Sequence, residues 1–286
     1  MSHAHRPVNR VLIVYKSHDE RAEQLSREVS NYLTEQGIEQ KRLSYGDVDF
    51  DRSLEWDLAV SLGGDGTFLF TARLLLDLCV PILPVHMGTF GYITEISGSE
   101  WHFALTRCLK GDYSISKRMV LQTVLYRKGE EIARHTAIND AVITCGMISR
   151  MVHLVMEVDG RMLADFRGDG LILATPTGST AYSMAAGGPI VHPEMDALIM
   201  TPICPFSLNF RPIILDKKEK ISVKVGENRQ KSLLLTIDGQ VVTPLEAGDR
   251  VCYESTDRCV PVITSRKRSF LDVVQSKLGW AGGPDA

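Results

Sequence analysis

The chain has 286 residues, of which 44% are hydrophobic and 23% are charged, with a formal net charge of -3. This composition is ordinary for a globular enzyme, and the lack of a basic excess argues against nucleic acid as a partner. The six cysteines are scattered without a C-x-x-C pair, so we expect reduced thiols. With no signal-peptide core and no apolar run of membrane-spanning length, we expect a cytoplasmic protein with no membrane partner.

The first third of the chain alternates between strand-like and helix-like segments. Apolar runs at 11–16, 57–62 and 80–85 predict three strands. Helices are predicted between and after them: the first has Ser17 as its N-cap with Glu20 three residues on, and the others occupy 68–78 and 99–111. This order predicts an α/β domain built on a parallel sheet, in which ligands bind beyond the carboxyl ends of the strands.

From about residue 114 the apolar residues alternate with a period of two, which is typical of strands. Turn signals at 128–131 and at Asp159-Gly160 separate consecutive runs. We therefore predict an α/β domain over residues 1–113, completed by the tail 264–286, and a mostly β domain over 114–263. Helical spacing at 270–280 predicts a terminal helix that packs back on the first domain.

The sequence GGDGT at 63–67 lies between a predicted strand and a predicted helix. Its glycines let backbone amides and the positive end of the helix dipole approach one anion, most often a phosphate. The P-loop pattern with its lysine is absent, so Mg²⁺ and a lysine or arginine from elsewhere would have to neutralise the phosphates. Asp65 would then accept the proton of an attacking hydroxyl. The alternative interpretation is a structural turn with Asp65 as a helix cap.

Three further segments are candidate binding loops or plain turns. The segment 176–189 is rich in hydroxyls and glycine and suits a polar ligand with ribose hydroxyls, but it also fits a simple connection. Asn139-Asp140 can hydrogen-bond to vicinal hydroxyls, or it can be only a turn. Asp238-Gly239 is interpreted as a hairpin turn. The eight histidines show no metal-ligand spacing, so no metal-binding residues are expected.

Taken together, these segments resemble the NAD kinase family. The matching stretches are GGDGTFL (63–69), MGTFGYITE (87–95), AINDAVI (137–143), RGDGLILATPTGSTAYSMAAGGPI (167–190), TPICPFSLNFRPIIL (201–215), IDGQ (237–240) and KLGW (277–280). Phosphofructokinases and diacylglycerol-type lipid kinases carry loops similar to GGDGT, and the TPTGSTAY segment separates the NAD kinases from them.

The resemblance implies a reaction and an architecture. The reaction is transfer of the γ-phosphoryl group of ATP, or a phosphoryl group of polyphosphate, to the 2′-hydroxyl of the adenosine ribose of NAD. Mg²⁺ or another divalent cation is expected to accompany ATP. The architecture is an N-terminal α/β domain that is phosphofructokinase-like and a β-rich C-terminal domain. A homodimer or homotetramer is expected to complete the NAD site across subunits.

The resemblance also assigns roles to residues by matching motif. Asp65 matches the general base. The phosphate contacts are matched by Gly63, Gly64, Gly66 and Thr67. The NAD contacts are matched by Asp65, Gly66, Phe90, Tyr92, Asn139, Asp140, Arg167, Asp169, Thr180, Ala181, Tyr182, Ala185 and Gln240.

Four positions depart from the family pattern. His86 replaces an asparagine, Tyr92 a phenylalanine, Ala185 a frequent serine and Asp140 the commoner glutamate. These changes bear on affinity and nicotinamide contacts more than on the reaction. Two other functions stay open: a lipid or sugar kinase that uses GGDGT, and a dinucleotide-binding sensor without catalysis, against which the retained Asp65 argues.

Overall fold

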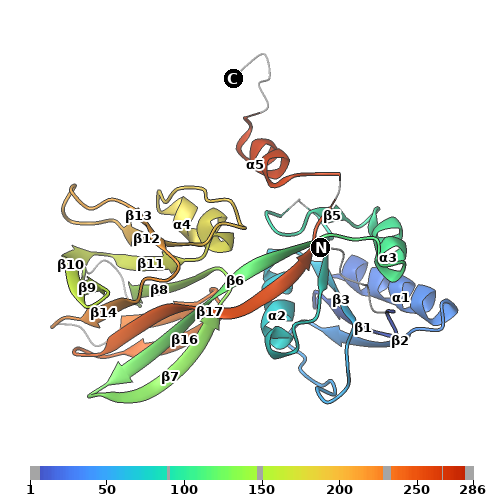
Figure 1. The fold of residues 1–286 in the computed structure, drawn as a ribbon, viewed down its shortest axis with the longest axis horizontal. Helices are drawn as coiled ribbons and strands as arrows, with labels where there is room; N and C mark the ends of the chain where they lie inside the picture. The colour runs from blue at the N-terminus through green and yellow to red at the C-terminus, as the bar shows by residue number, and fades with distance from the viewer. Residues whose placement is uncertain (1–6, 89–90, 147–150, 228–232, 266, 281–286) are drawn as a thin grey trace. The chain divides into compact units, whose positions relative to one another are not determined.

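The computed structural model describes residues 7–88, 91–146, 151–227, 233–265 and 267–280 (Figure 1). Phe90, one of the expected NAD contacts, lies outside these residues. The chain divides into two compact units: the first comprises Met1–Lys117 with Val260–Ala286, and the second comprises Arg118–Cys259. Each unit has its own buried core.

The first unit is an α/β structure whose main sheet is parallel. Its strand order is β17-β4-β3-β1-β2, with β5 beside β4. The strands are β1 (Arg10–Tyr15), β2 (Glu39–Ser44), β3 (Leu58–Gly63), β4 (Ile82–His86), β5 (Ile96–Ser97) and the end of β17 (Arg250–Ile263). The helices are α1 (Glu20–Glu35), α2 (Asp65–Leu74), the 3-10 turn η1 (Leu76–Leu78), α3 (Trp101–Leu109) and α5 (Phe270–Leu278). The predicted α/β class and parallel sheet are confirmed.

The first helix begins later than its sequence pattern indicated. Ser17 was expected as the N-cap, but α1 begins at Glu20 and its cap is Asp19, whose carboxylate accepts the amide hydrogen of Ala22. Asp19 has an extended backbone, and a carboxylate at this position also interacts favourably with the helix dipole. The strand β2 was not predicted from the sequence, because Leu43 is its single buried residue.

The second unit is mostly β, as predicted. One sheet has the antiparallel order β13-β12-β11-β8-β15-β16, and the other contains β10-β9-β14-β17 with β6 and β7. The strands are β6 (Ile115–Arg127), β7 (Glu130–Ala137), β8 (Asp140–Cys145), β9 (Val152–Val158), β10 (Arg161–Gly168), β11 (Gly170–Ala174), β12 (Ala197–Ile203), β13 (Ile213–Asp216), β14 (Ile221–Val225), β15 (Leu233–Ile237) and β16 (Val241–Leu245).

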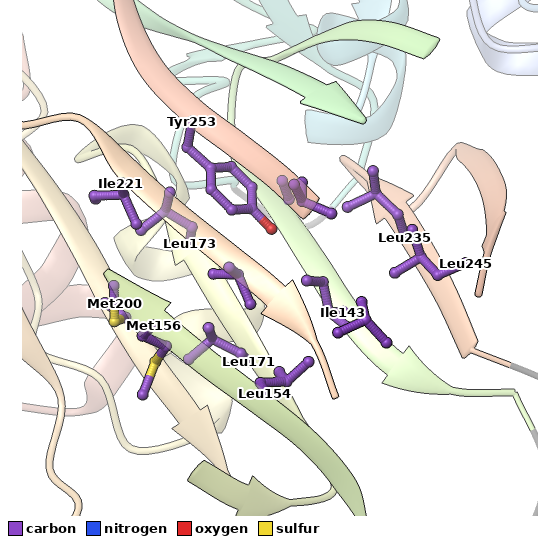
Figure 2. Close-up of a cluster of buried hydrophobic side chains, with 14 of the residues drawn as sticks. Ile143, Leu154, Met156, Leu171, Leu173, Met200, Ile221, Leu235, Leu245 and Tyr253 are labelled. Atoms are coloured by element: carbon purple, nitrogen blue, oxygen red, sulfur yellow. The ribbon is translucent and has the colours of Figure 1, made fainter. Parts of the chain in front are cut away.

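The core of the second unit lies between these two sheets. Figure 2 shows Leu154 and Ile221 of one sheet in the same cluster as Leu171 and Leu235 of the other. The apolar side chains that alternate along each strand fill this space, as in other sheet-on-sheet packings. The hairpin predicted at Asp159-Gly160 is confirmed, since both residues have positive φ, as a type I′ turn requires.

Candidate active site

The glycine sequence 63–67 connects β3 to α2 at the carboxyl edge of the parallel sheet. Gly64 is the N-cap of α2 and Asp65 is the first helical residue, so the interpretation of Asp65 as a helix cap is wrong. A Cβ on Gly63 would overlap the side chain of Thr67, which is itself buried, so a glycine here lets the helix pack closely against the strand end. Gly64 and Gly66 face open space, which leaves their backbone accessible to an anion.

The carboxylate of Asp65 is held by the backbone of residues 92–94. Its Oδ2 accepts the amide hydrogen of Tyr92 at 3.0 Å, and its Oδ1 accepts those of Ile93 at 3.3 Å and Thr94 at 3.2 Å. The hydroxyl of Thr94 donates to Oδ1 as well, at 3.1 Å. A Cβ on Gly91 would overlap this carboxylate. The carboxylate therefore has one fixed orientation, and Oδ2 carries fewer of these hydrogen bonds than Oδ1.

His86 ends β4 beside the glycine loop, since it pairs in register with Gly63. Its Nδ1 lies 2.9 Å from the carbonyl oxygen of Gly88, a geometry in which Nδ1 carries the proton. Burial lowers the pKa of His86, and the positive charges of Arg268 and Lys277 lower it further, against the opposing effects of the Gly88 hydrogen bond and Glu100. The ring is therefore neutral at pH 7.

A second set of candidate residues lies in the other unit, around Asn139 and Asp140 at the start of β8. Three consecutive amides, of Ile138, Asn139 and Asp140, donate to the carboxylate of Asp238 at 2.7 to 3.1 Å. Thr175 secures the same stretch by donating its hydroxyl to the carbonyl of Ile138. Asp238-Gly239 is the hairpin turn that the sequence indicated, with positive φ at both residues. The sequence interpretation missed the contact of the Asp238 carboxylate with residues 138–140.

The side chains of Asn139 and Asp140 are buried, with exposed fractions of 9% and 4%. Burial, together with the negative charge of Asp238, raises the pKa of Asp140 to about 7. Within the described part of the chain, Oδ1 of Asn139 and Oγ1 of Thr177 are buried without a hydrogen-bond partner. Buried polar atoms of this kind are costly, so they indicate a place where a ligand supplies the missing donors.

The hydroxyl-rich segment forms the 3-10 turn η2 (Thr177–Thr180) and the short helix α4 (Tyr182–Ala185). Several of its hydroxyls hold the segment itself: Ser179 donates to the carbonyl of Pro176, and Ser183 bonds to Thr201. A Cβ on Gly178 would overlap the backbone of Asn139, so this glycine permits the close approach of the two segments. The segment is thus more than a connection, because it packs against Asn139.

The remaining candidates of the second unit do not all gather with Asn139. Thr180 is buried in η2, Ala181 follows it, and Tyr182 and Ala185 are exposed on α4. Gln240 is half-buried just after the Asp238 turn. Arg167 and Asp169 are exposed and lie before β11, whereas Asp140 pairs with Ala174 at its other end. A five-residue strand separates these ends by about 13 Å.

Two features are absent from the described residues. They contain no group of three or more His, Cys, Asp or Glu side chains arranged to hold a metal ion. None of the helices in the same ranges is both long and apolar enough to cross a membrane.

Comparisons with known proteins agree over nearly the whole chain. Residues 16–113 match the ATP-NAD kinase N-terminal domain and residues 138–265 match the ATP-NAD kinase C-terminal domain. The NAD kinase of Geotalea daltonii is 40% identical over 282 residues, covering 96% of this chain and 99% of that protein. The NAD kinase of Treponema denticola is 37% identical over 277 residues, covering 96% of this chain and 98% of that protein.

Solved structures give the same result. The yeast NADH kinase complexed with NADH has a TM-score of 0.88 and 27% identity, over 97% of this chain and 89% of that one. An NAD kinase from Archaeoglobus fulgidus in complex with ATP has a TM-score of 0.74 and 25% identity, over 93% of this chain and 98% of that one. The matched domains and the full-length relatives lead to one conclusion: the chain belongs to the ATP-NAD kinase family.

Proposed function

We propose that this protein is an NAD kinase that transfers the γ-phosphoryl group of ATP to the 2′-hydroxyl of the adenosine ribose of NAD, giving NADP. The observation that carries the proposal is the Asp65 carboxylate, fixed at the carboxyl edge of the sheet by three amides and a hydroxyl. Residues at this edge face the ligand in open α/β sheets. A fixed carboxylate beside a glycine loop suits phosphoryl transfer to a hydroxyl.

In the proposed reaction, Asp65 accepts the proton of the 2′-hydroxyl through Oδ2. A sugar hydroxyl is a weak acid, so it needs a base when it attacks phosphorus at neutral pH. The 2′-oxygen forms a bond to the γ-phosphorus as the bond to the β-phosphate oxygen breaks, which leaves ADP. The open backbone of Gly64 and Gly66 binds the phosphates and keeps the two oxygens in line.

We propose Mg²⁺ as the cofactor of ATP. The described residues contain no cluster of side chains that would hold a metal ion on its own. That fits Mg²⁺, which usually keeps several waters and binds through one or two carboxylates and substrate phosphates. The phosphates of ATP, with waters, would hold it, and Asp65 keeps its role as the base. When bound, the ion neutralises charge on the phosphates.

Asn139 and Asp140 are assigned to the ribose hydroxyls of NAD. The buried Oδ1 of Asn139 requires a donor, and a ribose hydroxyl is one. Asp140 can accept a hydrogen bond when ionised and donate one when protonated, and both forms are populated near pH 7. Asp238 fixes the backbone that carries both side chains.

We further propose that the protein is a cytoplasmic homodimer or homotetramer. Two features support the oligomer. Arg167 and Asp169 lie at the opposite end of β11 from Asp140, so they would contact NAD held by a second copy. The second unit also exposes large apolar side chains, among them Phe206 at 76% and Leu208 at 80%.

The proposed function is tested by incubating the purified protein with NAD⁺, Mg²⁺ and either ATP or polyphosphate. NADP⁺ is followed through an NADP-specific dehydrogenase. NADP⁺ formation with ATP is expected, and the polyphosphate reaction identifies the range of donors. A folded protein that binds NAD⁺ and forms no NADP⁺ with either donor would contradict the kinase proposal in favour of a sensor.

A further inference from the structure

The glycine loop of this chain contains an acidic residue and no basic one. P-loops and kinase sites place a lysine on the β- and γ-phosphates, because several negative charges must be balanced there. With Asp65 in the loop, the local charge is unfavourable for a phosphate chain. Besides the Mg²⁺ proposed above, a lysine or arginine from outside the loop would help to balance this charge.

Three of the basic residues near this edge of the sheet already have carboxylate partners. Lys267 and Arg268 both bond to Glu100, at 3.1 and 2.9 Å. Lys16, which follows β1, lies 3.9 Å from the carboxylate of Asp19. Lys277 differs from them: within the described residues its ammonium pairs with no carboxylate, and it lies 5.7 Å from the centroid of the Tyr92 ring.

The terminal helix α5, part of the first unit, carries Lys277 on the same side as its buried residues. Val273 and Val274 form its buried face, and Lys277 lies four and three residues after them, on the same side of the helix. The helix has a defined start, since Ser269 and Asp272 form a capping box. Helix packing therefore fixes the position of the Lys277 backbone, and the Tyr92 ring orients its side chain.

Two separate links connect Lys277 to the glycine loop. The first runs through Tyr92, whose amide donates to Asp65 Oδ2 at 3.0 Å. The second runs through His86, whose pKa is lowered in part by the charge of Lys277, and which is the register partner of Gly63. The two links use different residues but the same stretch of chain, since His86 ends β4 and Tyr92 lies in the segment after it, and the charge of Lys277 already acts on His86 beside the loop.

We propose that Lys277 contacts the phosphate chain of the phosphoryl donor at the glycine loop and supplies the cation that the loop lacks. This role rests on the proposed kinase function. A contact with phosphates predicts equal effects on ATP and on polyphosphate, because the adenine is not involved. It also predicts that binding of NAD changes little.

The test compares three variants in the full-length protein: Lys277→Gln, Lys277→Arg and the matched control Lys267→Gln. Steady-state kinetics give the KM values for ATP and for NAD separately. Calorimetry measures binding of Mg²⁺-tripolyphosphate, which needs no turnover. Lys277→Gln should raise the KM for ATP and weaken tripolyphosphate binding about tenfold or more, as expected for the loss of a charge-assisted hydrogen bond. The KM for NAD should stay within about twofold, and Lys277→Arg should restore most of the loss.

Several results would overturn the inference. One is a Lys277→Gln variant with unchanged ATP kinetics and tripolyphosphate affinity. Another is a loss of tripolyphosphate affinity in Lys16→Gln and not in Lys277→Gln, which would assign the phosphate contact to Lys16. A Lys277→Gln variant in which the KM values for ATP and NAD rise together and the Tm falls would show that Lys277 has only a structural role in α5. If the wild-type protein formed no NADP⁺ and Lys277→Gln still weakened tripolyphosphate binding, the kinase function would fail while the phosphate contact stood.

Discussion

The raised pKa of Asp140 predicts a specific dependence of stability on pH. In the folded protein this pKa is about 7, against an ordinary value of 3.8. The folded state therefore holds a proton that the unfolded chain releases between these values. The stabilising effect of Asp140 is complete below about pH 3.8 and is lost as the pH rises through about 7. Asp140→Asn keeps the shape of the side chain and removes the titration.

The size of the effect follows from the pKa. From pH 5 to about pH 7 the folded carboxyl is mostly protonated while the unfolded one is ionised. Over these two pH units, each unit lowers the free energy of unfolding of the wild type by about 1.4 kcal/mol. Relative to the wild type, Asp140→Asn should therefore be about 3 kcal/mol more stable at pH 8 than at pH 5. The two histidines with lowered pKa, His86 and His135, are present in both proteins, so their contributions cancel.

Urea unfolding of both proteins at pH 5, 6, 7 and 8, without nucleotide, measures this difference. The quantity to compare is the difference in unfolding free energy between wild type and variant at each pH. A difference that stays constant across the range would refute the assignment of a raised pKa to Asp140. Asp140 would then be ionised in the folded protein throughout this range, because neither state would exchange a proton between pH 5 and pH 8.

Three further predictions concern Asp65, Gly91 and Asp238. Asp65→Asn should retain the fold and NAD affinity and lower kcat by roughly 10²- to 10⁴-fold, as for the loss of a general base; near-normal turnover would remove Asp65 from the mechanism. Gly91→Ala should lower kcat as well, because its Cβ would displace the Asp65 carboxylate, and unchanged kinetics would show that the 92–94 amides are not needed. Asp238→Ala should destabilise the second unit by about 3 kcal/mol or more, because three buried amides lose their acceptor. Urea unfolding measures this loss, and a loss below about 1 kcal/mol would contradict the prediction.

The sequence predicted those strands and turns whose signals lie within a few neighbouring residues. The runs at β1, β3 and β4 are buried on both faces, so they read as continuous apolar segments. The Asp-Gly pairs at 159–160 and 238–239 set positive φ and made their hairpins visible. The strand β2 was not visible because it lies at the edge of the sheet and is mostly polar. The N-cap of α1 was misplaced because two capping residues, Ser17 and Asp19, lie close together in the sequence.

The contacts that shape the candidate site are non-local, which is why the sequence did not reveal them. Asp65 reaches residues 27 to 29 positions later, and Asp238 reaches amides about 100 positions earlier. No periodicity or spacing rule connects such segments. The motif resemblance named Asp65, Asn139 and Asp140 but could not show what fixes them. Asp238, which was interpreted as a turn, and residues 92–94 carried a partial signal, because IDGQ and MGTFGYITE are among the family motifs.

The carboxylates of Asp65 and Asp238 make the same kind of contact with the backbone, but their roles are opposite. Each accepts three consecutive backbone amides, those of 92–94 and of 138–140. At Asp65 a glycine permits the close approach, since a Cβ on Gly91 would overlap the carboxylate. At Asp65 the carboxylate is the reactive group and the amides orient it. At Asp238 the carboxylate is the support and the amides belong to the residues that bind ligand. Removing Asp238 should therefore weaken NAD binding and stability together, whereas loosening residues 92–94 should reduce turnover with less effect on stability.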